Sequence, residues 1–291
     1  MRAECVSLTG AAPDSHGIAI SARCVDVSRG AYLTSCSEIR FETSSLTELC
    51  AHIKSIGLHA DEFRVSVVKK PRNLKLNAMA LARDIGSAIG GRANLSAPKV
   101  TFLTVVTNEK MWFGRLLSES QRVWLAHNQR PYVTSSSLPA RLAHVLVNLV
   151  ASPGERLLDP CCGTGTIVLA AAQSGMAAVG YDLNPRMVGA TTKNLQHFGL
   201  SADISLADAR QIGGQFDAVA TDLPYGINLV KDTAEEREIL SNLQGLAPKA
   251  AFIALRDLRG LLTDLGYRIE QVLPVPKLSI VRRIFITGRT E

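Results

Sequence analysis

A glycine-rich turn at residues 159–165 (DPCCGTG) is the first stretch whose residue types and spacing suit chemistry. Its two glycines let a backbone approach a ligand and adopt dihedral angles that are closed to other residues. Asp182 stands 19 residues beyond Gly163, at the end of the next predicted strand, where its carboxylate can accept hydrogen bonds from two ribose hydroxyls. The pattern predicts a site for an adenosine-bearing cofactor, and a nicotinamide dinucleotide and S-adenosylmethionine (SAM) both fit it.

Three details favour SAM. Val168 stands where the dinucleotide fingerprint needs a third glycine, close to the pyrophosphate. Asp159 precedes the turn, where it can pair with the ammonium group of the donor, and Asp208 follows the third strand, where it can accept a hydrogen bond from the adenine amine. A dinucleotide needs its anion stabilised, which carboxylates do not do. We therefore predict that SAM is bound by Asp159, Cys161, Cys162, Gly163, Thr164, Gly165, Asp182, Leu183, Asp208 and Ala209.

The tetrapeptide Asp222-Leu223-Pro224-Tyr225 suits methyl transfer to an exocyclic amine on a base. The lone pair of such an amine is delocalised into the ring, so its nitrogen is a poor nucleophile. Asp222 and the Leu223 carbonyl can accept the protons of the amine, because Pro224 fixes the chain direction there. Tyr225 offers a face on which a base stacks, worth about 1–3 kcal/mol, once the base is exposed or flipped. We predict these four residues as catalytic, although an isolated tetrapeptide of this kind is more often a turn with a buried tyrosine.

Cysteine usage and hydropathy indicate a cytoplasmic protein. None of the six cysteines forms a paired CxxC pattern, and the chain is not a small secreted one that needs disulfides. We predict reduced thiols, with Cys161 and Cys162 as small buried residues of the turn and no bound metal. No run of 18 apolar residues predicts a membrane span, and the N-terminus lacks the apolar region of a secretory signal.

The net charge of +6 is concentrated in one block. Residues 64–130 contain 12 Lys and Arg against 3 Asp and Glu, whereas the rest of the chain contains 20 against 23. A basic block beside a nearly neutral one indicates a polyanion-binding module joined to a catalytic one, and the alternative is a solvated basic face without a partner. The predicted RNA contacts are Lys69, Lys70, Arg72, Lys75 and Arg115.

The elements that must position these residues alternate between strand and helix from residue 156 onward. Strands are predicted at residues 156–159, 178–181, 203–206, 216–221 and 250–255, with helices between them and a closing strand pair at 272–275 and 280–287. This alternation predicts an α/β fold with a largely parallel, doubly wound sheet. We place the domain boundary between an N-terminal region, residues 1–125, and a catalytic domain, residues 126–291.

The N-terminal region predicts a smaller α/β domain. Residues 6–8, 18–27 and 31–33 predict short strands, residues 45–56 a capped helix, and the remainder a strand, a basic loop, a helix and a strand hairpin. This order over residues 40–120 resembles the THUMP domain, an RNA-binding module of tRNA-modifying enzymes. A generic small α/β domain is the alternative.

The motifs together resemble one enzyme family. DPCCGTGTI, the DLPY tetrapeptide and the upstream "RPY…SSSLPARLAHVLVNLV" are similar to those of the THUMP-containing tRNA guanine-N2-methyltransferases. The resemblance implies a Rossmann-like class I methyltransferase fold, SAM as the cofactor and tRNA as the partner, with guanosine-10 or guanosine-6 as the target. It also implies that residues 134–138 line the donor pocket.

Other functions stay open on the sequence alone. The tetrapeptide also suits guanine N2 in ribosomal RNA or adenine N6 in a nucleic acid. Outside this class, a protein-glutamine N-methyltransferase meets the same delocalised nitrogen, but it has no use for the basic block. The oligomeric state, monomer or homodimer, is not indicated.

Overall fold

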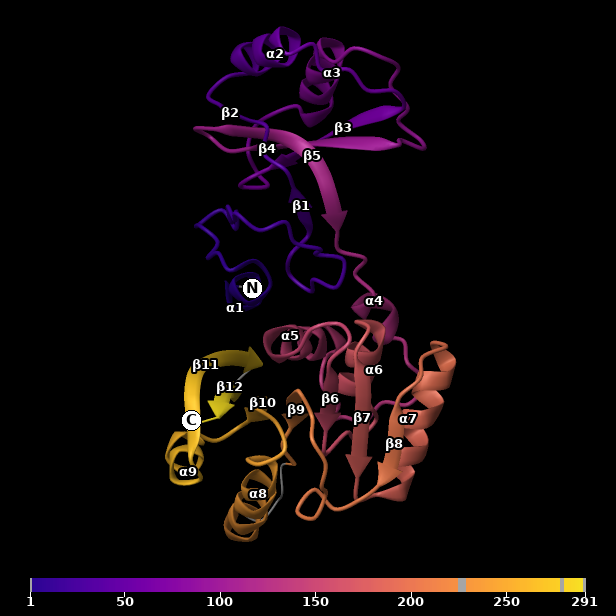
Figure 1. The fold of residues 1–291 in the computed structure, drawn as a ribbon, viewed down its shortest axis with the longest axis vertical. Helices are drawn as coiled ribbons and strands as arrows, with labels where there is room; N and C mark the ends of the chain where they lie inside the picture. The colour runs from indigo at the N-terminus through magenta and orange to yellow at the C-terminus, as the bar shows by residue number, and fades with distance from the viewer. Residues whose placement is uncertain (1, 225–228, 278–279, 290–291) are drawn as a thin grey trace. The chain divides into compact units, whose positions relative to one another are not determined.

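The computed structural model describes residues 2–224, 229–277 and 280–289, and it divides them into two compact units (Figure 1). The first unit contains Met1–Ser28 and Tyr32–Gln121, and the second contains Arg29–Ala31 and Arg122–Glu291. The division after Gln121 lies close to the predicted boundary. No helix of the described residues has both the length and the hydropathy to cross a membrane.

A five-stranded sheet forms the centre of the first unit. The strands β3 (Phe63–Lys69) and β4 (Val100–Val106) run parallel, and β5 (Met111–Glu119) returns antiparallel to β4. The short strands β1 (Ser35–Ser37) and β2 (Phe41–Thr43) pair with the other side of β5. The predicted strand, helix and hairpin are therefore confirmed as an α/β unit.

Two helices cover one face of this sheet: α2 (Leu46–Ser55) and α3 (Ala78–Ala88) (Figure 1). The hydroxyl of Ser45 caps α2 by accepting from the Glu48 N–H at 3.2 Å, as the capping pattern predicts. Apolar side chains of both helices then pack against strand phenylalanines in one core, which includes Leu49, Ile53, Ile85, Phe63, Phe102 and Phe113.

The predictions for the start of the chain were wrong. Residues 6–8 belong to the helix α1 (Arg2–Thr9), and residues 18–27 and 31–33 form no strand. The buried carboxylate of Glu4 accepts the Tyr32 N–H at 2.7 Å, a contact that spans 28 residues. Short apolar runs do not by themselves distinguish a strand from a helix.

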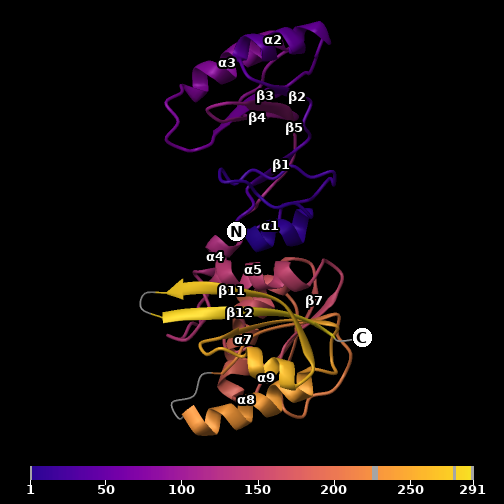
Figure 2. The ribbon, with the colours of Figure 1, turned by 90° about the vertical axis from the view of Figure 1, so that its left-hand side faces the viewer.

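A seven-stranded sheet forms the centre of the second unit, in the order β11-β12-β10-β9-β6-β7-β8. All strands except β12 run parallel to one another. Their bounds are β6 (Arg156–Asp159), β7 (Ala177–Asp182), β8 (Asp203–Leu206), β9 (Ala218–Asp222), β10 (Lys249–Ala254), β11 (Tyr267–Lys277) and β12 (Ile280–Arg289). The predicted doubly wound sheet is confirmed, and Figure 2 shows its closing hairpin, β11 and β12, as two long neighbouring strands.

Helices bury both faces of this sheet. On one face, α5 (Ala140–Val150), α6 (Thr166–Gln173) and α7 (Pro185–His197) contribute apolar residues to one core. On the other face, α8 (Leu229–Leu243) and α9 (Arg259–Asp264) contribute to a second core. The short helix α4 (Trp124–His127) precedes α5. Burial on both faces explains why the central strands β6, β9 and β10 are short, mainly apolar runs.

The segment Arg29–Ala31 belongs to the second unit although it lies far upstream in the sequence. The guanidinium of Arg29 donates to the Ala151 carbonyl at 2.9 Å, and the amide of Asn148 donates to the Arg29 carbonyl at 3.0 Å. Nothing in the local sequence of this segment predicts that it joins the catalytic unit.

Candidate active site

The glycine turn connects β6 to α6, as predicted. Gly163 and Gly165 have φ of +54° and +81°, in the left-handed region that favours glycine. A Cβ at Gly165 would lie 2.5 Å from a methyl of Thr191, whereas a Cβ at Gly163 would meet nothing within 4 Å. Thr191 also donates its hydroxyl to the Gly163 carbonyl at 2.7 Å. One glycine is therefore required by packing, and the other leaves open space beside the turn.

That open space is part of a cleft of about 440 Å³, a size typical of small-molecule sites. The cleft lies at the carboxyl ends of β6, β7 and β9, where open α/β sheets bind their ligands. Its described lining residues are Thr134, Ser136, Ser137, Leu138, Asp159, Cys161, Cys162, Gly163, Thr164, Thr166, Ile167, Asp182, Asn184, Met187, Asp222, Leu223 and Pro224.

Asp182 is fixed at the end of β7 by two backbone donors. One carboxylate oxygen accepts the Gly163 N–H at 2.8 Å, and the other accepts the Asn184 N–H at 2.8 Å. An ionised carboxylate has about four acceptor positions, so each oxygen can still accept a ribose hydroxyl. The position of Asp182 thus suits the predicted role.

Asp159 is buried at the end of β6, with 2% of its surface exposed. Its carboxylate accepts the Thr221 hydroxyl at 2.8 Å and the Cys161 N–H at 3.3 Å. Burial, and to a smaller extent the nearby carboxylates of Asp182 and Asp222, raises the pKa of Asp159 to about 7. A cationic ligand would relieve this destabilisation of the ionised form, so the donor set fits the ammonium and sulfonium charges of SAM.

The two cysteines of the turn are thiols rather than thiolates. Burial raises the pKa of both Cys161 and Cys162 above the ordinary thiol range. Within residues 2–224, 229–277 and 280–289, no cluster of three His, Cys, Asp or Glu side chains offers a metal site. These properties suit small packing residues of the turn.

Asp222 ends β9 and lines the same cleft, together with Leu223 and Pro224. The Leu223 N–H donates to the Ile253 carbonyl at 3.1 Å, which holds the tetrapeptide to the edge of β10. The fourth member of the tetrapeptide, Tyr225, lies outside the described residues. The structure therefore brings three of the four predicted catalytic residues to the donor cleft.

Comparisons with known proteins identify the domain that contains this cleft. The family model of the RMKL-like methyltransferase domain matches residues 127–245. A probable tRNA (guanine(10)-N2)-dimethyltransferase of Methanothermococcus thermolithotrophicus is 30% identical over 164 residues, which cover 52% of this chain and 99% of that protein. The chain belongs to the RMKL-like methyltransferase family. A SAM-dependent family confirms the predicted cofactor.

One further relative and one solved structure are similar to this RMKL-like methyltransferase. The tRNA (guanine(10)-N2)-dimethyltransferase of Methanothermobacter thermautotrophicus is 34% identical over 164 residues, which cover 53% of this chain and 49% of that protein. The chain spans about half the length of such curated relatives. The crystal structure of TrmN from Thermus thermophilus matches with a TM-score of 0.51 at 21% identity, covering 93% of this chain and 88% of TrmN. This likeness confirms the predicted Rossmann-like fold.

The loop at residues 134–138 contributes Thr134, Ser136, Ser137 and Leu138 to the lining of the cleft, as the resemblance implies. The Ser137 and Thr164 hydroxyls lie 3.0 Å apart. Asn194, fully buried on α7, accepts the Tyr132 N–H at 3.0 Å and donates to the carbonyls of Tyr132 and Thr164 at 2.9 and 2.8 Å. Sequence reasoning missed Asn194, and the only available signal was a polar residue on the buried stripe of α7.

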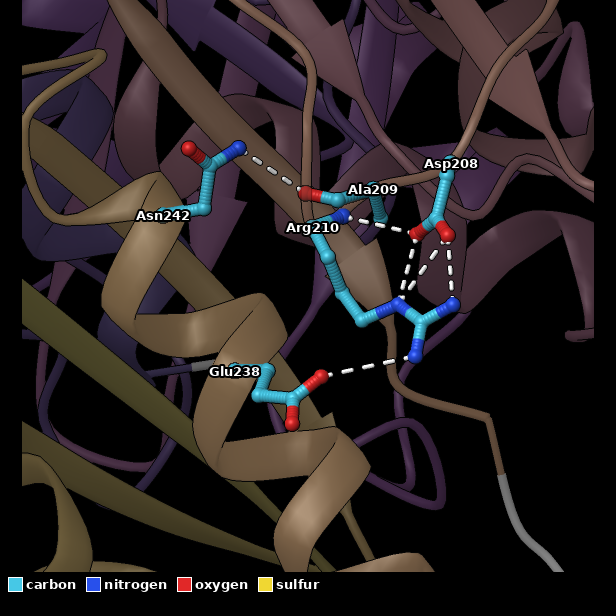
Figure 3. A network of polar contacts seen from close by, with 5 residues as sticks. All are labelled: Asp208, Ala209, Arg210, Glu238 and Asn242. Carbon is cyan, nitrogen blue, oxygen red and sulfur yellow. Dashed lines mark hydrogen bonds and ion pairs between the residues drawn. The ribbon is translucent and has the colours of Figure 1, made fainter.

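Not every predicted cofactor residue lines the cleft. Asp208 is bound by the Arg210 guanidinium at 2.5–3.0 Å, which lowers the pKa of Asp208 to about 2 (Figure 3). Arg210 also reaches Glu238 of α8, and Asn242 donates to the Ala209 carbonyl at 3.0 Å (Figure 3). Gly165, Leu183, Asp208 and Ala209 are absent from the described lining. Their roles toward the donor stay predictions.

The predicted RNA-binding residues of the first unit are not equivalent. The Lys69 ammonium donates to the carbonyls of Leu74 and Leu76 at 3.0 and 3.4 Å, so this side chain closes its own loop. Arg72 and Lys75 are exposed on that loop. Arg115 is exposed on β5 and stands opposite Phe102 of β4. Lys69 stands opposite Val106, which lies four residues further along β4.

Proposed function

We propose that this chain transfers the methyl group of SAM to the exocyclic N2 of a guanosine in tRNA. The observation that carries the proposal is that Asp222 and Leu223 line the same cleft as the donor turn. The relatives named as tRNA (guanine(10)-N2)-dimethyltransferases support guanosine-10 as the target. A cytoplasmic location follows from this substrate.

In this proposal, the donor cleft orients SAM, which supplies an electrophilic methyl group. Asp159 pairs with a cationic group of the donor, and Asp182 accepts its ribose hydroxyls. The turn and the loop at residues 134–138 enclose the ligand, so that much of the rate enhancement comes from orientation.

Asp222 and the Leu223 carbonyl act on the acceptor amine. Each accepts one N–H, which localises the lone pair on nitrogen and directs it at the methyl carbon. As the N–C bond forms and the C–S bond breaks, the nitrogen becomes positive and gives one proton to a carboxylate oxygen of Asp222. No covalent enzyme intermediate is needed.

The basic surface supports a nucleic acid over a protein substrate. Arg72 and Lys75 present charge on one exposed loop of the first unit, and residues 64–130 have a net charge of +9 against −3 for the rest of the chain. Phosphate contacts of this kind make binding steeply dependent on salt.

Adenine N6 is the second candidate acceptor, because the carboxylate and carbonyl acceptors suit either amine.

The direct test is methylation of defined RNA. The purified protein is incubated with SAM and unmodified tRNA transcripts, and the nucleosides are separated by mass spectrometry. N2-methylated guanosine is expected, and a transcript with adenosine at the modified position is the control. N6-methyladenosine as the only product would replace the proposed acceptor. Transfer of the SAM methyl group to protein and not to RNA would support a glutamine methyltransferase.

A further inference from the structure

Arg282 contacts the carboxylate of Asp222, and its own strand brings it there. Asp222 pairs with Ile253 of β10, and Ile253 pairs with Ile284 of β12. Because β12 is antiparallel, its first residues lie at the carboxyl edge of the sheet. The Arg282 Nη1 lies 3.4 Å from the Asp222 Oδ2, and the two side chains are only 11% and 17% exposed.

The charge balance of the cleft indicates a role for this contact. Among its described lining residues, Asp159, Asp182 and Asp222 are acidic, and none is lysine or arginine. Carboxylates that share a site oppose one another's ionisation, and Asp159 already responds in this way. Asp182 is held by two backbone donors, whereas Asp222 has a guanidinium behind it.

Packing alone does not explain an arginine at this position. Residues two apart on a strand share a face, so Arg282 lies on the face of Ile284, which is buried in the core under α5 and α6. A half-buried ion pair gives little net stability compared with apolar residues of similar volume. Folding stability therefore does not account for Arg282, and its contact with Asp222 indicates a role in orienting that carboxylate.

We propose that Arg282 is a positioning residue for methyl transfer, which holds the Asp222 carboxylate aimed at the acceptor amine. The role rests on the proposed function, since it assigns Asp222 to that amine. Arg282 is not among the described lining residues of the donor cleft, and it acts through its contact with Asp222. Its removal must therefore lower the rate of the bound complex while leaving donor binding nearly unchanged.

The test compares Arg282→Gln with Arg282→Lys and with a control, Arg268→Gln. The Arg268→Gln variant removes the same charge from the same hairpin. Arg268, however, pairs with Glu270 and stands opposite Gly288, near the far end of β12. With saturating SAM and tRNA, kcat of Arg282→Gln is expected to fall roughly 10–100-fold, the loss of a charge-assisted contact. The Kd for SAM should stay within about threefold, and Arg268→Gln should match the wild type.

The lysine variant separates positioning from a merely structural role. Lysine keeps the charge without the planar fork, so Arg282→Lys should regain part of the lost kcat but not all of it. Wild-type kcat in Arg282→Gln, or an equal loss in Arg268→Gln, would overturn the proposal. If Arg282→Gln does not fold, Arg282→Lys decides alone, and a kcat within about twofold of the wild type overturns it.

This outcome is distinguishable from failure of the proposed function. A wild-type protein that binds SAM but methylates no guanosine would remove the proposed function. An active wild type with fully active Arg282 variants would remove only the role of Arg282.

Discussion

At the scale of single residues, Asp159 combines a position suited to the donor with a cost to folding. Its pKa is raised from 3.8 to about 7 in the folded protein. The folded state therefore holds a proton that the unfolded state releases, so stability falls as the pH rises from about 4 to about 7. Above pH 7 the full cost is present, on the order of 4 kcal/mol for this shift.

Asp159→Asn should remove that cost. At pH 8 and without SAM, the variant is expected to unfold several degrees above the wild type, because its neutral amide still accepts from Thr221. Near pH 4 the two proteins should have similar midpoints, which is the internal control. Thermal unfolding across this pH range measures both, and calorimetry should show at least a tenfold loss of SAM affinity. Equal stability at pH 8 would contradict the assigned pKa.

The sequence predicted the residue types of the site better than their contacts. The cleft gathers Asp159, Asp182 and Asp222, which stand at the ends of three parallel strands and could be found from strand and motif spacing. Arg282 and Asn194 could not be found in this way. Their partners are distant in sequence, and a single polar residue in an apolar segment does not reveal which backbone or carboxylate it will meet.

At the scale of elements, the strand-turn-helix at residues 156–173 sets the donor site. The alternation of strand and helix segments along the sequence was sufficient to predict this unit and the sheet around it, because both faces of the sheet are buried by helices. The start of the chain gave no such pattern, and its helix α1 was mistaken for a strand.

The two glycines of the turn should respond differently to alanine. Gly165→Ala places a methyl group on Thr191 at a positive φ and should destabilise the protein by roughly 2–4 kcal/mol. Gly163→Ala meets no neighbour, so it should cost only about 1–2 kcal/mol of stability, from its φ. Its methyl group should instead lower SAM affinity. Urea unfolding and calorimetry separate the two effects, and equal destabilisation would show that the Thr191 contact is not limiting.

Asn194 should couple the loop at residues 134–138 to the turn. Asn194→Ala removes three hydrogen bonds between α7, Tyr132 and Thr164, so it should weaken SAM binding and lower stability by about 1–3 kcal/mol. Asn148→Ala, which removes a buried hydrogen bond from α5 to the Arg29 carbonyl, is a control for stability. If both variants lose SAM affinity equally, Asn194 has no special link to the donor site.

At the scale of the whole molecule, charge is uneven along the sequence but not between the two units. The first unit contains 14 Lys and Arg against 11 Asp and Glu, and the second contains 18 against 15, so each carries a net charge of +3. The basic block from residue 64 to 130 is partly balanced within the first unit by the acidic residues that precede it. Composition could not reveal that Lys69 is used to close its own loop, since that depends on where two backbone carbonyls point.

The loop lysines should therefore differ in RNA binding. Lys75→Gln should raise the KM for tRNA and reduce the slope of log K against log salt by about 1, as expected for one lost phosphate contact. Lys69→Gln should mainly lower the unfolding temperature, because it leaves the Leu74 and Leu76 carbonyls without this donor. Filter binding across salt concentrations and thermal unfolding test the pair. An unchanged salt slope in Lys75→Gln would remove this loop from the RNA contact surface.

The proposed function requires that a SAM site and an amine-accepting carboxylate share one cleft. Mass spectrometry of tRNA nucleosides, after incubation with SAM and either the wild type or Asp222→Ala, tests it most directly. The wild type should form N2-methylated guanosine, and Asp222→Ala should form none while its SAM affinity stays within a few fold. Methylated guanosine formed at the wild-type rate by Asp222→Ala, or loss of SAM binding in that variant, would contradict the account.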